Sequence, residues 1–384
     1  MKKAVYLLAA AAMMASCNQE GILVDPAEVT ADVPRAIGFE TFVDKATRAT
    51  DANNSTALND YYPTFNVYGW KTVGQEEPVC VFNNIPVEFF AQDAQGEVVY
   101  NEEGEKPSNE WTFEANNWYY ENLRYWDKMA SEYLFSAYAP AAASTVVGCD
   151  ATGLITIGSV DAPITVEGTN LMEDAPAEAL AYTGFEYDYM TAQATDKVGQ
   201  VSLTFNHLQA KLNIRIKLSD AITTAQDVSI QKIQIHNLSD KAYYTNAAGV
   251  GVSGWTIAET SANYVPGIAT AYTLNNATAN YHNHYVLEQL IIPQTIDKYV
   301  GNDLSSIAEY TEACVYVEYT IGAEKFKSYS PLANIFIEDG TTTTYDFKGG
   351  NQYTLNITVG PAPIEFKAEV AEWAEAVQGG LDMD

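Results

Sequence analysis

The feature that most constrains the fold is a strict alternation of polar and apolar residues over residues 211–218 (KLNIRIKL). Successive side chains of a β-strand point to opposite faces of the sheet, so this period of two predicts a strand with one buried face. The same alternation recurs in five further stretches, at residues 65–69, 201–205, 315–319, 353–359 and 364–370. Such clear alternation is typical of antiparallel sheets with one face in water, and not of the doubly covered parallel sheets of α/β proteins.

Turn-forming residues separate these stretches, and helical patterns are weak. The turn signals are Asn83-Asn84, Gly267, Asp339-Gly340 and residues 349–351 (GGN). Pro176 interrupts the helical pattern of residues 171–180, and residues 305–312 suffice for one or two turns at most. Residues 370–377 have helical spacing but continue directly from a strand pattern, so their structure stays open. The sequence therefore predicts an all-β fold of two antiparallel β-sandwich domains.

The densest strand region lies in the middle of the chain, and we place the domain boundary there. The predicted parts are a signal segment (1–17), a tether with the first strand (18–48), an N-terminal domain (49–208) and a C-terminal domain (209–384).

The charge balance excludes nucleic acid as a partner. The chain has 20 Lys and Arg residues against 50 Asp and Glu residues, a formal net charge of −30 over 384 residues. Such a surface repels a phosphate backbone. Because 47% of the residues are hydrophobic, the chain has ample material for a core and is not a disordered acidic tail.

The first seventeen residues indicate export and lipid attachment. Lys2 and Lys3 precede an apolar stretch, residues 4–15, which is too short to span a bilayer and ends in small residues before Cys17. This arrangement resembles a bacterial lipobox, in which Cys17 becomes the acylated first residue of the mature protein. The alternative is an ordinary secretory signal whose cysteine is incidental. Asn18 after the cysteine is compatible with an outer-membrane lipoprotein.

The remaining cysteines, Cys80, Cys149 and Cys314, do not indicate a disulfide framework or a catalytic thiol. An odd number of cysteines in an exported chain cannot pair completely. Cys80 and Cys314 lie within apolar runs, so we expect buried small hydrophobic residues there.

No motif indicates an enzyme, a metal or a cofactor. The glycines of residues 249–254 lack the lysine and helix of a phosphate-binding loop, and a turn is the better interpretation. His282 and His284 share one strand face, but a pair without a third ligand is weak evidence for metal. His207 follows an apolar strand, as a hydrogen-bonded and partly buried histidine would.

Several segments, taken in order, resemble the fimbrillin family of type V fimbrial subunits and accessory proteins. They are the lipobox at Cys17 and the segments 36–42 (AIGFETF), 47–49 (TRA), 118–120 (WYY), 123–126 (LRYW), 135–140 (FSAYAP), 203–208 (LTFNHL), 290–295 (LIIPQT), 364–366 (IEF) and 370–373 (VAEW).

The resemblance implies two transthyretin-like β-sandwich domains, export as a lipoprotein to the cell surface, other fimbrial subunits as partners and no enzymatic activity. It also implies that an arginine-specific protease cuts between Arg48 and Ala49 and removes the first strand, which carries Ile37, Phe39 and Val43. The emptied groove would then accept a strand from a neighbouring subunit.

Two points stay open at the level of sequence. Arg35-Ala36 is a competing cleavage site, although a cut there leaves the first strand attached. The donor strand is expected near the C-terminus, and its candidate residues are Ile364, Phe366, Val370, Trp373 and Val377. Residues 364–370 suit equally well the closing strand of the chain's own second domain.

The alternative function is a lipid-anchored protein that does not polymerise and binds a host glycan or protein. β-Sandwiches with exposed aromatic residues suit sugar stacking as well as assembly.

Overall fold

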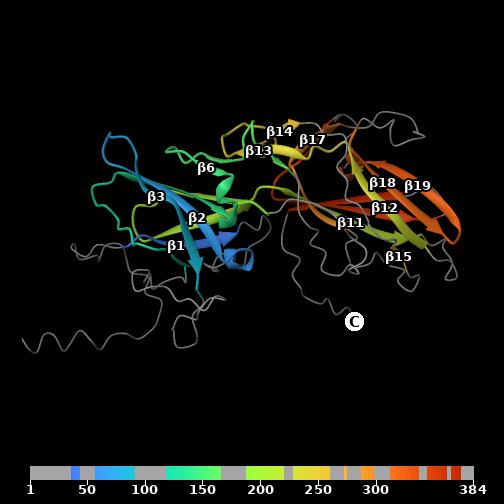
Figure 1. Cartoon of the computed structure of the whole chain (residues 1–384), viewed down its shortest axis with the longest axis horizontal. Helices are drawn as coiled ribbons and strands as arrows, with labels where there is room; N and C mark the ends of the chain where they lie inside the picture. The colour runs from blue at the N-terminus through green and yellow to red at the C-terminus, as the bar shows by residue number, and fades with distance from the viewer. Residues whose placement is uncertain are drawn as a thin grey trace, which may run out of the picture. The chain divides into compact units, whose positions relative to one another are not determined.

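The computed structural model describes residues 36–43, 57–90, 118–165, 187–219, 228–259, 272–274, 287–297, 312–336, 344–360 and 365–372. These residues form an all-β fold, as predicted, in which the helices are short 3-10 turns: η2 (Ala57–Asp60), η4 (Ala141–Thr145) and η6 (Leu332–Ile335) (Figure 1). Within this described part, no helix has the length and apolar character needed to cross a membrane.

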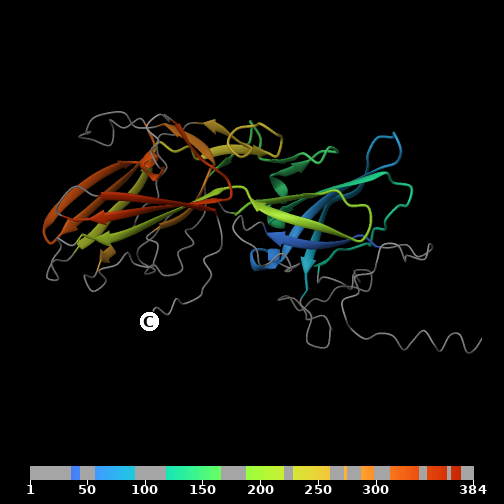
Figure 2. The same ribbon diagram turned by 180° about the vertical axis from the view of Figure 1, so that it is seen from behind.

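The first sheet of the described residues has seven strands in the order β1-β10-β9-β5-β2-β3-β4. Its strands are β1 (Gly38–Val43), β2 (Thr64–Thr72), β3 (Val79–Phe89), β4 (Trp118–Tyr119), β5 (Glu132–Ala139), β9 (Met190–Ala194) and β10 (Gln200–His207). One face of this sheet buries an aromatic-rich core that includes Phe39, Phe65, Phe82 and Phe135. Figure 2 shows the blue β1 beside the yellow-green β10.

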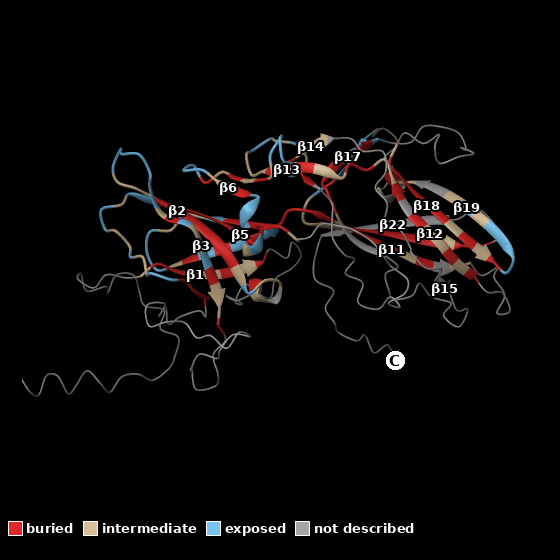
Figure 3. Cartoon of the chain, in the orientation of Figure 1, coloured by how far each residue is buried: buried red, intermediate tan, exposed pale blue. Residues whose placement is uncertain are grey.

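The later strands form four-stranded sheets in the orders β16-β11-β21-β22 and β15-β12-β18-β19. Their strands are β11 (Ala210–Leu218), β12 (Val228–His236), β15 (Tyr272–Leu274), β16 (Leu287–Ile291), β18 (Cys314–Ile321), β19 (Glu324–Pro331), β21 (Asn351–Val359) and β22 (Glu365–Glu372). Their inner faces bury a second core of aliphatic and aromatic side chains, drawn in red in Figure 3.

A further sheet, with the order β14-β13-β7-β6 and β8 paired to β13, combines strands from both sides of residue 208. Its strands are β6 (Val147–Cys149), β7 (Ile155–Ile157), β8 (Ile164–Thr165), β13 (Lys241–Thr245) and β14 (Trp255–Glu259). The pair β17 (Gln294–Asp297) and β20 (Thr344–Phe347) forms a separate two-stranded sheet. The domain division near residue 208 stays a prediction. β13, which follows that boundary, pairs with β7 and β8, which precede it.

The described residues of all six alternating stretches lie within strands, but not every pairing is antiparallel. β10 alternates between buried and exposed residues over its length, as one-sided burial requires. β1 pairs with β10 and β11 pairs with β21 in parallel, so the prediction of purely antiparallel sheets is wrong. Alternation reports that one face of a sheet is covered, whereas strand direction depends on how distant segments meet.

The turn predictions had mixed outcomes. Gly349 and Gly350 form the turn between β20 and β21, and residues 249–254 form a turn rather than a phosphate-binding loop. Asn83-Asn84 is not a turn, because both residues lie inside β3, where the register with β2 shifts. Asn84 has a φ of 54°, a left-handed conformation that asparagine tolerates and that suits a local irregularity in a strand.

Candidate functional site: the first strand and its groove

The first strand forms one edge of the seven-stranded sheet. β1 pairs in parallel with β10 over six positions, from Gly38 opposite Gln200 to Val43 opposite Phe205. Parallel neighbours must be joined by a long connection, and more than 150 residues separate these two strands in the chain. β1 is therefore an N-terminal segment added to a sheet built from later residues.

The start of β1 is held by the segment that follows β4. Ala36 forms an isolated bridge with Tyr125, and the Ile37 backbone N–H donates to the Arg124 carbonyl at 2.8 Å. The Tyr120 hydroxyl donates to the Ile37 carbonyl at 2.6 Å. These contacts pair the beginning of the strand on the side away from β10, so both backbone edges are hydrogen-bonded there.

The side chains of β1 fill the core in an alternating pattern. Ile37, Phe39 and Thr41 are completely buried and Val43 nearly so, whereas Glu40 is only half-buried and bonds the Ser202 hydroxyl. Burying three apolar side chains contributes about 4.5–9 kcal/mol at about 1.5–3 kcal/mol each, before the cost of ordering the strand. A sheet without β1 would expose this part of its core to water.

Phe39 is the central anchor of the strand. Its ring meets four aromatic rings edge to face, with centroids at 6.2 Å (Phe65), 5.4 Å (Phe82), 5.8 Å (Tyr120) and 5.9 Å (Phe135). Edge-to-face pairs of this kind add about 0.5–1.5 kcal/mol beyond the burial of area. The groove under β1 therefore has a defined pocket for one large ring.

Thr41 fits the groove less well. Its hydroxyl is fully buried and has no hydrogen-bond partner among the described residues. Such a hydroxyl costs about 1–3 kcal/mol relative to a bonded one. The first strand is thus a good occupant at position 39 and an imperfect occupant at position 41.

The two predicted cleavage sites have different relations to this strand. Arg48-Ala49 lies outside the described residues, in the connection between β1, which ends at Val43, and η2, which begins at Ala57. A cut there separates β1 covalently from the rest of the fold. Ala36 is the first described residue and is bridged to Tyr125, so a cut after Arg35 leaves β1 on the chain.

At the C-terminus, the candidate donor residues fall into two groups. β22 pairs with β21 along its whole length, which puts Phe366 opposite Ile357 and Val370 opposite Tyr353. Residues 365–372 are therefore a closing edge strand of the chain's own sheet in this structure. Ile364, Trp373 and Val377 lie outside the described residues, as does Cys17.

The cysteines are free thiols with different exposure. Cys314 is buried, as expected, but Cys80 is exposed and that expectation was wrong, because it precedes the point where β3 turns its apolar side chains into the core at Phe82. Burial raises the pKa of both the Cys149 and Cys314 thiols to about 12 and also raises the pKa of Cys80. Protonated thiols are poor nucleophiles.

His207 is buried and hydrogen-bonded, as the sequence indicated. It ends β10, and its Nδ1 lies 2.9 Å from Asp188 Oδ2. His282 and His284 lie outside the described residues. Among the residues that are described, no cluster of three or more His, Cys, Asp or Glu side chains could hold a metal ion.

A sequence profile described as fimbrillin-like matches residues 47–373, which is most of the chain. The chain belongs to the fimbrillin-like family. Membership implies a structural rather than a catalytic role for this fimbrillin-like chain, a place at the cell surface and association with other fimbrial subunits. No curated protein matches the sequence at a significant level.

Among solved structures, the fold is similar to a fimbrial protein from Bacteroides vulgatus, with 14% identity, a TM-score of 0.49 and coverage of 88% of this chain and 100% of that one. It is also similar to the tip fimbrial protein Mfa3 from Porphyromonas gingivalis, with 12% identity, a TM-score of 0.37 and coverage of 82% and 95%. At these scores the family assignment rests on the sequence profile.

Sequence reasoning missed the residues that hold the start of β1. Tyr120 and Arg124 lie in the aromatic segments that resembled the family, but their partners are more than eighty residues away in the chain. The unusual density of aromatic residues over 118–126 was the available signal, and it does not specify a partner.

Proposed function

We propose that this fimbrillin-like chain is a fimbrial subunit that joins its neighbour by strand exchange at the position of β1. The observation that carries the proposal is that the most N-terminal strand fills an aromatic core as an edge strand and is followed by an arginine in its connecting segment. A cut after Arg48 would leave β1 held by non-covalent contacts alone.

The emptied groove would be a strong acceptor. It would present the unpaired backbone groups of β10 and an apolar floor that includes Phe65, Phe82 and Phe135. Open edges of this kind recruit a strand, with main-chain hydrogen bonds giving affinity and alternate side chains giving register. The same joint repeated head to tail does not close, and it builds a filament.

The donor is expected beyond β22. Withdrawing β22 would give up eight paired positions with β21 to gain a similar number elsewhere, so the exchange would bring little net stabilisation. A donor supplied by residues 373–384, with Trp373 and Val377 as its larger apolar side chains, would leave the eight β21–β22 pairs in place.

One observation favours β22 as a second candidate donor. The alternate residues of 364–370 are Ile, Phe, Ala and Val, and those of 37–43 are Ile, Phe, Thr and Val in the same order. Placed in register in the groove, residues 364–370 would put Phe366 in the ring pocket of Phe39 and Ala368 in place of Thr41.

Protease treatment of the purified chain tests the acceptor. An arginine-specific protease should yield a new N-terminus at Ala49, and unboiled samples should then form ladders on a denaturing gel. Arg48→Gln should abolish the ladder, whereas the matched variant Arg35→Gln should retain it. Ladders that persist in Arg48→Gln, or a mature N-terminus at Ala36, would contradict the proposal.

Two variants separate the donors. Truncation after Glu372 removes the tail but leaves every β22 pairing in place, so it should give a folded monomer that no longer polymerises. If ladders survive the truncation, the tail is not the donor. In that case Phe366→Ser, which alters β22 alone, should abolish them.

We also propose that Cys17 carries lipid and anchors the precursor in the outer membrane. Metabolic labelling with an alkynyl fatty acid should tag the wild-type precursor and not Cys17→Ala. Labelling of the mutant would exclude this attachment site. Retention of the lipid on all surface molecules would indicate an anchor protein that is never cut at Arg48.

A further inference from the structure

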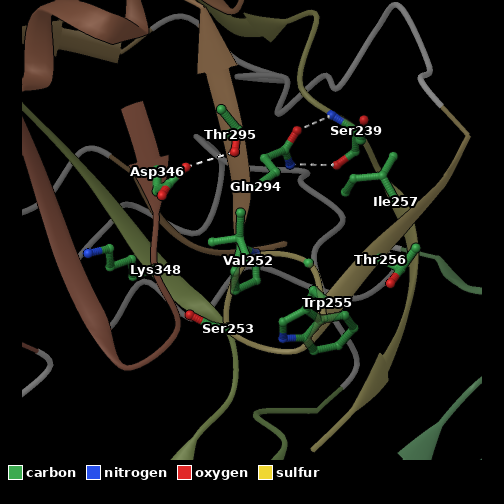
Figure 4. A pocket seen from close by; sticks show the side chains of 12 residues that line it. Ser239, Val252, Ser253, Trp255, Thr256, Ile257, Gln294, Thr295, Asp346 and Lys348 are labelled. Atoms are coloured by element: carbon green, nitrogen blue, oxygen red, sulfur yellow. Dashed lines mark hydrogen bonds between the residues drawn. The ribbon is translucent and has the colours of Figure 1, made fainter. Parts of the chain in front are cut away.

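A polar pocket of about 630 Å³ lies between the turn before β14 and the two-stranded sheet β17–β20 (Figure 4). Val252, Ser253, Trp255 and Thr256 line it from the β14 side, and Figure 4 shows Gln294, Thr295 and Asp346 across from them. Its volume falls within the range of about 300–1,000 Å³ that is typical of small-molecule sites.

The inner end of the pocket is fixed by hydrogen bonds. Gln294 Oε1 accepts from the Ser239 backbone N–H at 2.9 Å, and Gln294 Nε2 donates to the carbonyls of Ser239 and Ile292, both at 3.1 Å. The buried indole N–H of Trp255 donates to the Leu208 carbonyl at 2.8 Å. These side chains are fully engaged, so they shape the pocket rather than bind within it.

The rim is also held in place. Ser253, with a φ of 51°, accepts the Gly349 backbone N–H on its hydroxyl at 3.0 Å, which ties the turn before β14 to the turn after β20. The Thr295 hydroxyl donates to Asp346 Oδ1 at 2.7 Å. A pocket whose walls are already ordered costs a ligand little reorganisation.

Free polar groups remain at the mouth. Asp346 Oδ2 has no partner among the described residues, and no ion pair within that part of the chain engages the Lys348 ammonium, two residues along. The Thr256 hydroxyl lines the same opening. Val252, which is half-buried, adds a small apolar surface between these groups.

We propose that this pocket binds a neutral saccharide. A sugar ring offers adjacent hydroxyls that can donate to the Asp346 carboxylate and accept from Lys348, while its C–H face packs on the half-buried Val252. Hydrogen bonds between hydroxyls and a carboxylate are charge-assisted and direct the orientation of the ring.

The charges of the site select against ionic ligands. The lining carries one carboxylate, Asp346 on β20, and one ammonium, Lys348 just after β20, so neither an anion nor a cation meets a site of opposite net charge. The chain as a whole carries a net charge of −30, which further disfavours sulfated or sialylated glycans. A neutral polyhydroxylated ligand can hydrogen-bond to both charged groups without bringing a charge of its own.

The site is independent of strand exchange, because none of its lining residues belongs to β1 or to the seven-stranded sheet. Binding can therefore be measured on the Arg48→Gln chain, which is expected to remain uncut. A negative result for sugar would leave the assembly proposal untouched, and a failed assembly assay would leave the pocket untouched.

Saturation-transfer NMR tests the proposal with the methyl glycosides of mannose, galactose, fucose and N-acetylglucosamine and with their short neutral oligomers. At least one should give a transfer signal, and Asp346→Ala should weaken its binding about tenfold or more, the size expected for a hydrogen bond to a charged group. The matched control is Asp297→Ala, an exposed aspartate of the same two-stranded sheet that does not line the pocket. Thr256→Ala provides a second, milder variant on the opposite wall.

Three results would overturn the assignment. The first is the absence of a signal from every neutral sugar. The second is equal loss of binding in Asp346→Ala and Asp297→Ala, or no loss in Asp346→Ala and Thr256→Ala. The third is binding confined to sialylated or sulfated glycans or to peptides.

Discussion

Replacement of Phe39 by alanine should destabilise the uncut chain but leave the assembled polymer unchanged. Phe39 is completely buried, and four aromatic rings lie within 6.2 Å of its ring centroid. If β1 leaves when the chain is cut after Arg48, the altered residue leaves with it. The same substitution should therefore lower stability before assembly and have no effect after it.

The magnitude follows from the loss of buried aromatic contacts. Truncating a buried phenylalanine to alanine costs about 3–5 kcal/mol, and the number of edge-to-face neighbours favours the upper half of that range. For a unit of 150–250 residues, about 1 kcal/mol shifts the melting temperature by about 2–4 °C. The uncut Phe39→Ala chain should therefore melt roughly 8–20 °C lower than wild type.

Denaturant titration of the Arg48→Gln background measures the first effect, and the temperature at which gel ladders dissociate measures the second. Phe65→Ala is the matched control, because Phe65 is equally buried, contacts Phe39 and remains in the body of the subunit. It should weaken both the uncut chain and the polymer. A polymer weakened as much by Phe39→Ala as by Phe65→Ala would refute the idea that β1 is exchanged.

Three further predictions concern single side chains. Thr41→Val removes a buried hydroxyl without a described partner, so the uncut chain should gain about 1–3 kcal/mol in urea unfolding and form ladders more slowly after cleavage. Iodoacetamide at pH 8 should label exposed Cys80 before Cys149, whose pKa is raised to about 12 by burial; peptide mass spectrometry that finds the reverse order would contradict the assigned burial. The hydrogen bond from Lys71 lowers the pKa of the Asp127 carboxyl. This bond therefore stabilises the fold at neutral pH, and the stabilisation is lost as the pH falls through the lowered pKa. Asp127→Asn should therefore lower the urea midpoint at pH 7 but not at pH 2.

The strands were predictable because alternation is a local signal. Along β10, inward and outward residues alternate without exception, so its pattern could be read from eight residues alone. β11 shows the limit of that reading. Leu212, Ile214 and Ile216 are buried as predicted, but Asn213 on the other face is buried too. The pattern of one strand indicates which of its faces is apolar. It does not indicate what covers the opposite face.

The partners of the first strand could not be read from the sequence. The apolar residues of β1 were visible as a strand, yet its parallel pairing with β10 joins segments about 160 positions apart. The polar pocket was equally invisible, since Ser239, Ser253, Gln294 and Asp346 belong to four separate segments. Each is an ordinary polar residue near a turn or on a strand, and only the fold gathers them.

The imperfect fit of Thr41 would give the proposed strand exchange a direction. While β1 is part of the chain, its covalent connection gives it a high effective concentration, which keeps it in the groove despite the buried hydroxyl. A cut after Arg48 removes that advantage, and β1 then competes on fit alone. A donor with an apolar side chain at the position of Thr41 avoids a penalty of about 1–3 kcal/mol, roughly a five- to 150-fold preference. Thr41→Val should therefore shift the competition back towards β1, and a free peptide of residues 36–48 carrying that substitution should inhibit ladder formation more strongly than the wild-type peptide. Equal inhibition by the two peptides would show that the threonine hydroxyl does not bias the exchange.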